Sequence, residues 1–138
     1  MPTALLLEDN ETDAYIARRA LSRWGGLDLV IAADLDAARA YLEAVRCGER
    51  PPVAAVFADL RLPRGSGFDL VEWARGIPEL ADIRFVLLTN YPDPETVRRA
   101  YALGVSSVIP KGELFADDGK LGEIVSHYWL DTNRARGL

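Results

Sequence analysis

The feature that most constrains this chain is a set of short apolar runs, each followed by a polar or turn residue. Runs of this length are typical of strands that are buried on both faces of a parallel sheet. The acidic pair Glu8-Asp9 follows the first run, Asp59 follows the third, and Lys111 lies just after the last. The sequence predicts five strands, at residues 4–7, 29–33, 53–58, 85–88 and 105–109.

Segments with apolar residues at helical spacing separate the predicted strands. Asn10 is placed to cap the first helix, and Gly25-Gly26 to end it. Strands and helices that alternate five times predict right-handed crossovers and helices on both faces of the sheet. We therefore expect an α/β fold, a flavodoxin-like doubly wound five-stranded parallel sheet of (βα)5 type. The helical spacing occurs within residues 17–24, 38–45, 70–74 and 97–104, and a fifth helix is expected near residues 121–131.

Length and charge narrow the function classes. The chain has 138 residues and a formal charge of −5, so we expect one domain over 1–138 and no nucleic-acid surface, which would need clustered Lys and Arg. The single cysteine, Cys47, excludes an internal disulfide. Neither a secretory signal nor an apolar stretch of membrane-spanning length is evident, which favours a bacterial-type cytoplasmic protein without a membrane partner.

The polar residues at the strand ends predict a reactive site. Parallel strands end at one edge of the sheet, so their carboxylates and ammonium group should converge there. Crowded carboxylates are costly without a cation, and we expect Glu8 and Asp9 to help to hold Mg²⁺. Asp59 precedes a Pro/Gly-rich turn and is a candidate nucleophile that would form an acyl phosphate. Thr89 and Lys111 are candidates to contact the phosphoryl oxygens. Any one of these residues alone would be an ordinary strand-end polar group, but their joint order favours a site.

These residues, in this order, resemble the receiver domain of two-component response regulators. The resemblance covers essentially the whole chain and includes Glu8-Asp9, the turn at 59–67, Thr89 and Lys111. In that family the matching aspartate accepts a phosphoryl group from a histidine kinase, and the residues that match Thr89 and Lys111 bind that group.

The resemblance also implies a metal site. Asp59 would be the phosphoacceptor, Asp9 a direct Mg²⁺ ligand, and Glu8 a ligand mostly through water. Arg61 would contribute its backbone carbonyl.

Two positions depart from the family pattern. Val108 stands where an aromatic switch residue is usual, and Gly112 stands where a proline usually follows the lysine. The opening at 8–10 and the segment 127–130 are similar to single-domain regulators that partner bacterial phytochromes.

The expected function is that of a single-domain response regulator, which signals by protein contact or phosphorelay and assists its own Mg²⁺-dependent phosphorylation and dephosphorylation. It would not be an enzyme acting on a separate substrate. One alternative is an α/β phosphatase that forms an aspartyl phosphate, although such enzymes usually carry a second carboxylate where Arg61 stands. A degenerate receiver that accepts no phosphate is the other alternative.

A homodimer is expected through the predicted C-terminal helix. Its apolar stripe leaves large side chains at the edge and on the far side, which would be buried by a second copy. The residues expected at this interface are Tyr128, Trp129 and Leu130.

Overall fold

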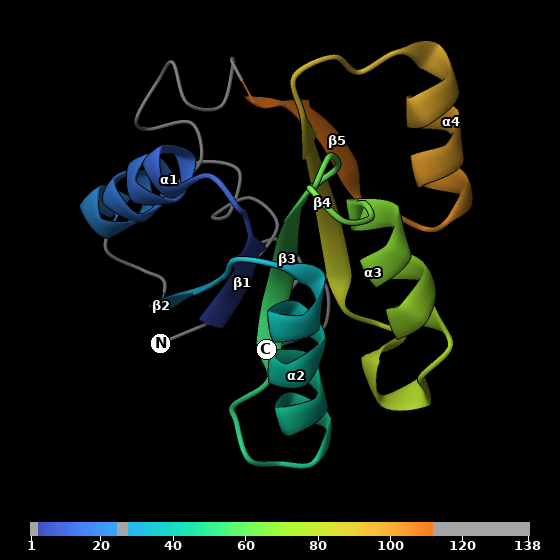
Figure 1. Ribbon diagram of the computed structural model, residues 1–138. Coiled ribbons are helices and arrows are strands. Elements are labelled where there is room, and N and C mark those ends of the chain that lie inside the picture. Colours follow the sequence, from blue (N-terminus) through green and yellow to red (C-terminus); the bar gives the residue numbers. More distant parts are fainter. Residues whose placement is uncertain (1–2, 25–27, 112–138) are drawn as a thin grey trace.

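The computed structural model describes residues 3–24 and 28–111 and contains one parallel sheet in the order β2-β1-β3-β4-β5 (Figure 1). This order and the alternating helices confirm the predicted doubly wound fold. The fifth helix expected near 121–131, and the dimer residues on it, lie outside the described residues. The strands are β1 (Thr3–Leu7), β2 (Asp28–Ala32), β3 (Val53–Asp59), β4 (Arg84–Thr89) and β5 (Ser107–Pro110). The helices are α1 (Glu11–Trp24), α2 (Leu35–Arg46), α3 (Gly67–Arg75) and α4 (Pro94–Ala102), with a short 3₁₀ helix, η1 (Pro78–Leu80).

The predicted strand bounds hold to within one residue except at β5. That strand was expected to begin at Val105, but it begins at Ser107. Val105 is buried, yet its backbone N–H donates to the carbonyl of Ala100 in α4. Its apolar character therefore reflects packing at the end of a helix rather than a place in the strand.

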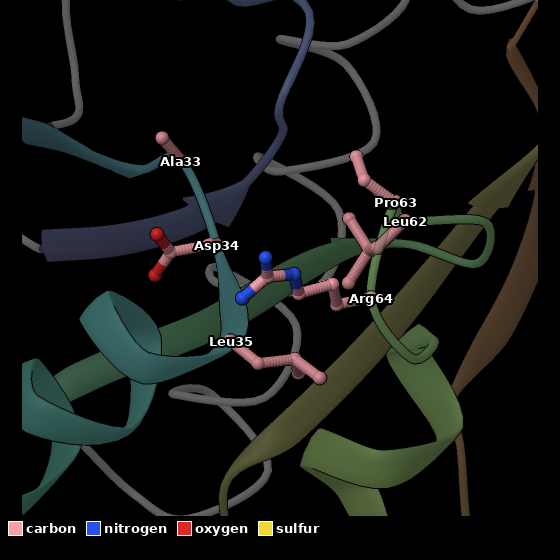
Figure 2. A pocket seen from close by; sticks show the side chains of 6 residues that line it. All are labelled: Ala33, Asp34, Leu35, Leu62, Pro63 and Arg64. Carbon is pink, nitrogen blue, oxygen red and sulfur yellow. The ribbon is translucent and has the colours of Figure 1, made fainter.

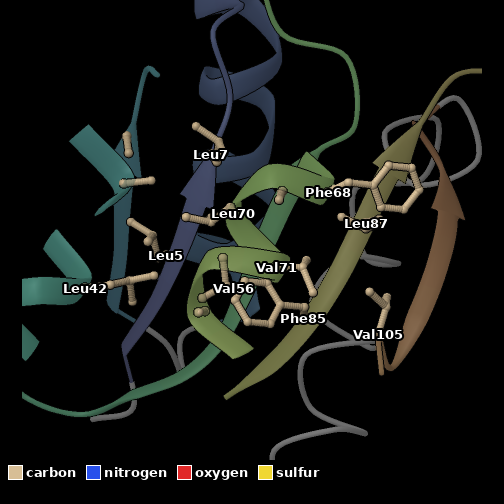
Figure 3. Packing of buried hydrophobic residues seen from close by; sticks show 14 of the residues in the cluster. Leu5, Leu7, Leu42, Val56, Phe68, Leu70, Val71, Phe85, Leu87 and Val105 are labelled. Carbon is tan, nitrogen blue, oxygen red and sulfur yellow. The ribbon is translucent and has the colours of Figure 1, made fainter. Parts of the chain in front are cut away.

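Alternate residues of the strands supply two separate cores, as the two-residue period of a strand requires. Leu5 and Leu7 pack with residues of α2, α3 and α4 on one face of the sheet, and Figure 3 shows α3 lying over this face. Leu6 packs with Ala17 of α1 on the opposite face. Helices thus cover both faces of the sheet. This confirms the prediction that the apolar strands are buried on both faces.

Each of the four α-helices begins at a polar cap near the carboxyl edge of the sheet. Asn10 accepts a hydrogen bond from the backbone of α1, and Asp34 and Asp93 do the same for α2 and α4. Ser66 caps α3 and forms a reciprocal capping box with Asp69. The predicted cap at Asn10 is confirmed, whereas Gly25-Gly26 lies outside the described residues. The caps fix where each loop turns back, and so place the strand-end side chains.

Two arginines hold α3 in place. Arg75 donates to the carbonyls of Ala81, Ile83, Leu103 and Gly104, which ties the end of α3 to the segments before β4 and β5. Arg99 of α4 lies over the ring of Phe68 at 4.3 Å and forms an ion pair with Glu72 at 3.2 Å. Arg99 is about half-exposed and joins α4 to α3. Both links are tertiary and fix α3 relative to its neighbours.

Within residues 3–24 and 28–111, no helix combines the length and the apolar character needed to cross a membrane.

Candidate functional site

The candidate site lies where the strand connections diverge. β1 lies between β2 and β3, so the chain leaves β1 toward one edge of the sheet and leaves β3 toward the other. Doubly wound sheets bind ligands at this switch point, beyond the carboxyl ends of the strands. Glu8 and Asp9 directly follow β1, and Asp59 is the last residue of β3. The topology thus brings together the acidic groups that the sequence singled out.

Three carboxylates form a compact cluster at this point. One oxygen from each of Glu8, Asp9 and Asp59 lies within 4.8 Å of the others. Glu8 and Asp59 are buried, whereas Asp9 is exposed. An all-oxygen donor set with one side open to water suits a hard divalent cation, which keeps several waters in its shell. The cluster fits a divalent metal ion.

Lys111 enters the cluster from the end of β5. Its ammonium nitrogen lies 2.5 Å from Glu8 Oε1, 2.8 Å from Asp13 Oδ2 and 3.4 Å from Asp59 Oδ2. Burial by itself would lower the pKa of Lys111, but the hydrogen bonds to Asp13 and Glu8 outweigh it and hold that pKa above its usual range. Lys111 is therefore a permanent cation within an acidic site.

The charge balance is unfavourable for Glu8. Burial raises the pKa of Glu8 to about 7, and the hydrogen bond from Lys111 offsets this only in part, because the neighbouring Asp59 adds a further negative charge. One ammonium group cannot neutralise several carboxylates in a poorly hydrated site. A bound cation would relieve this cost.

Thr89 and Arg61 lie at the same edge of the sheet. Thr89 is buried at the end of β4, next to the strand that carries Asp59, and its Oγ1 accepts a hydrogen bond from the N–H of Tyr91 at 3.3 Å. Arg61 is exposed and forms an isolated antiparallel bridge with Ser66, which closes the turn after β3. In the described part of the chain, neither side chain contacts the Asp59 carboxylate. The structure therefore joins Glu8, Asp59 and Lys111 directly and places Thr89 and Arg61 beside them.

Val108, the residue at the usual aromatic switch position, is half-buried. It packs against the core on the α2, α3 and α4 side of the sheet. Val108 therefore contributes to the packing of the core at this position.

Sequence reasoning missed the contact of Asp13 with Lys111. Asp13 lies in the first turn of α1, where an acidic residue is favourable for the helix dipole. The one signal in the sequence for this contact is that Asp13 lies four residues after Asp9. That spacing alone does not show that Lys111, which follows β5, lies next to Asp13.

A shallow pocket of about 280 Å³ opens beside this site (Figure 2). Asp34 and Leu35, at the start of α2, line one side of it, and Leu62, Pro63 and Arg64 of the turn after β3 line the other. The volume is just below the roughly 300–1,000 Å³ of usual small-molecule sites.

Comparison with known proteins identifies the family. No protein-family model matches the chain. A probable methanogenesis regulatory protein, FilR2, from Methanothrix harundinacea is 34% identical over 134 residues, which is 96% of this chain and 86% of that protein. Response regulator Rcp1 from Synechocystis is 28% identical over 93% of this chain and 88% of its own. The chain belongs to the response regulator receiver family.

Solved structures of response regulators agree with this family in fold. The Mn²⁺-bound form of Rcp1 has a TM-score of 0.80 with 26% identity and covers 96% of both chains. RPA3017, a response regulator in red light signalling of R. palustris, has a TM-score of 0.82 with 24% identity and likewise covers 96% of both chains, so it supports the fold alone. This response regulator is thus a phosphoacceptor signalling protein of the two-component type.

Proposed function

We propose that Asp59 is the residue that accepts the phosphoryl group, from a phosphohistidine of a sensor kinase. One carboxylate oxygen of Asp59 would form a bond to phosphorus while the P–N bond to the imidazole breaks, with the electron pair left on the imidazole nitrogen. The observation that carries this assignment is the position of Asp59 at the switch point, between the acidic pair and the ammonium of Lys111.

The other site residues would act on the transferred group. Lys111 would donate to one phosphoryl oxygen, since its ammonium already lies 3.4 Å from Asp59 Oδ2. Thr89, buried on the adjacent strand, would donate its hydroxyl to another oxygen. Burial of both donors supports this role, because a hydrogen bond to a charged group is stronger away from water.

Mg²⁺ is the proposed resident metal. Asp9 and Asp59 would bind it directly, Glu8 mostly through water, and Arg61 through its backbone carbonyl. When bound, the ion would neutralise charge on the carboxylates and on the incoming phosphoryl group. The cluster of oxygen donors supports this choice, since Mg²⁺ binds a few carboxylates and keeps several waters.

The output would be a contact with another protein or a phosphorelay. The proposed receiver domain over 1–138 would act through its own surface rather than by turnover of a small substrate. The phosphatase alternative is disfavoured because the exposed Arg61 stands where such an enzyme would need its second carboxylate.

The proposed kinase is of the bacterial phytochrome type. The likeness in fold to RcpA, a phosphorylated cyanobacterial phytochrome response regulator, supports this partner. Mixing purified kinase candidates with this protein and following phosphoryl transfer would test it.

A homodimer through Tyr128, Trp129 and Leu130 is also proposed. Sedimentation of the wild type against a Trp129→Ala, Leu130→Ser variant tests it. A wild type that sediments as a monomer at tens of micromolar, as the variant does, contradicts the dimer.

The central test is labelling with acetyl phosphate and Mg²⁺ followed by intact-mass measurement. The wild type should gain one phosphoryl group, and Asp59→Asn should gain none. Asp36→Asn, a change at an exposed position on α2, is the matched control and should label as the wild type does. Full labelling of Asp59→Asn would refute the assignment, continuous turnover would favour the phosphatase, and an unlabelled wild type would favour the degenerate receiver.

A further inference from the structure

We infer that Asp13 is a positioning residue for phosphoryl transfer, which holds the ammonium of Lys111 in the orientation that directs one N–H at Asp59. This inference rests on the proposed function and adds a residue to its machinery. Asp13 lies in the first turn of α1, and its Oδ2 is 2.8 Å from the Lys111 nitrogen. It would act through Lys111 and would not touch the phosphoryl group.

The three N–H bonds of the ammonium meet three carboxylates. Glu8 and Asp13 lie at 2.5 Å and 2.8 Å, and Asp59 lies further away at 3.4 Å. An ammonium group is a compact charge with three rotatable donors, so its orientation is set by the acceptors around it. The two closer carboxylates restrict the position of the ammonium group, which donates a hydrogen bond to Asp59 Oδ2 at 3.4 Å.

Asp13 differs from the other two acceptors because it lies outside the metal-type cluster. In residues 3–24 and 28–111, the carboxylates close enough to share one ion are Glu8, Asp9 and Asp59. A metal in that cluster would compete with Lys111 for the oxygens of Glu8 and Asp59. Asp13 would then remain the acceptor that belongs to Lys111 alone.

The position of Asp13 is itself well fixed. Its backbone N–H donates to Asn10 Oδ1 at 2.9 Å, and the next N–H, of Ala14, donates to the Asn10 carbonyl at 3.0 Å. Asp13 therefore sits on a capped helix rather than on a loop, and its side chain is 29% exposed. Groups held on regular elements give more exact geometry than groups on loops.

The step that depends on this geometry is the approach of phosphorus to Asp59. Lys111 can stabilise charge on the phosphoryl oxygens only if its N–H is already directed there, since a preorganised donor costs no reorganisation during the reaction. Without Asp13, the ammonium would follow Glu8 and the contact with Asp59 would lengthen. Misplacement of a donor by this kind of shift lowers rates by roughly ten- to a hundredfold.

The test compares phosphorylation rates by acetyl phosphate with saturating Mg²⁺. Asp13→Ala should label about tenfold more slowly than the wild type. Asp13→Asn keeps an acceptor oxygen at the same place and should restore the rate to within about threefold. Glu11→Gln, at an exposed residue in the same helical turn, is the matched control and should leave the rate unchanged.

A double-mutant cycle with Lys111→Ala separates positioning from a general effect on the fold. If Asp13 acts through Lys111, Asp13→Ala should produce no further loss of rate in the Lys111→Ala background. An equal loss in both backgrounds would overturn the inference, as would a wild-type rate in Asp13→Ala. A wild type that takes no phosphoryl group would instead refute the proposed function itself.

Discussion

The ammonium of Lys111 lies 2.5 Å from Glu8 Oε1 but 3.4 Å from Asp59 Oδ2. The buried Glu8 therefore competes with Asp59 for the ammonium group of Lys111. Even so, burial raises the pKa of Glu8 to about 7 from its usual 4.5, so the pair is not a simple stabilising salt bridge.

The first prediction concerns pH. Because the pKa of Glu8 is higher in the folded than in the unfolded state, the folded protein binds more protons between pH 4.5 and about 7. The free energy of unfolding of the metal-free protein should therefore fall as pH rises through this window. Glu8→Gln, which cannot ionise, should reduce this slope. Thermal unfolding measured in the presence of a chelator across this pH window checks the prediction. Glu79→Gln, at an exposed position, is the control. An unchanged slope in Glu8→Gln would contradict the assignment.

The second prediction concerns the metal. Mg²⁺ at about a hundred times its dissociation constant should stabilise the wild type by ~2.7 kcal/mol through mass action. Asp9→Ala should remove most of this gain, because Asp9 is a cluster carboxylate, and its exposure means that the fold itself should tolerate the change. Melting temperatures with and without Mg²⁺ measure the effect. Glu11→Ala should keep the full shift, and a full shift in Asp9→Ala would argue against this site.

The third prediction concerns Arg75. Its guanidinium donates to four backbone carbonyls, at distances from 2.5 to 3.3 Å, and also lies 5.2 Å from the centre of the Phe85 ring. Arg75→Met should lower the free energy of unfolding by roughly 2–4 kcal/mol, since hydrogen bonds from a charged donor are lost and carbonyls are left without partners. Denaturant unfolding provides the measurement.

Arg98→Met is the control for that loss. Arg98 is exposed and forms an ion pair with Glu95 in the preceding turn of α4, a type of ion pair that contributes about 0.3–0.5 kcal/mol. Equal losses in the two variants would show that the carbonyl contacts of Arg75 add little.

The fourth prediction concerns Gly67, the first residue of α3. A Cβ atom there would lie 2.8 Å from the carbonyl oxygen of Asp59 and 3.0 Å from Leu87 Cδ2. Gly67→Ala should therefore force α3 away from β3, the strand that ends at Asp59, and lower the free energy of unfolding by roughly 1–3 kcal/mol. Gly76→Ala, at the other end of α3, meets no atom closer than 3.6 Å and should change stability little. Chemical unfolding of both variants decides between them, and similar values would show that the close approach is relieved cheaply.

The sequence was sufficient to predict the sheet because local signals agreed with the global fold. Apolar runs of strand length recur between helical segments, and Asn10 and Ser66 mark helix starts by their side-chain chemistry. The predicted start of the last strand at Val105 was wrong for a physical reason. Buried positions carry apolar residues both at a helix terminus and in a strand, and the apolar pattern alone does not distinguish the two.

In the functional site, too, some features follow from the sequence and others do not. The identities of Glu8, Asp9, Asp59 and Lys111, and their places at strand ends, follow from the sequence, since parallel strands share one carboxyl edge. The contact of Asp13 with Lys111 does not, because it joins a residue of α1 to the residue that follows β5, 98 positions away, and depends on how the helix lies against the sheet.

By itself, the sequence determined the kind of sheet, the edge at which chemistry gathers and the residue types available there, because these depend on periodicity and on chain order. Only the tertiary structure decided which carboxylates share the single ammonium group, that Arg75 binds carbonyls rather than an acid, and that Glu8 is buried enough to resist ionisation. Such outcomes depend on distances of a few ångströms and on exclusion of water, and both arise when distant segments pack together.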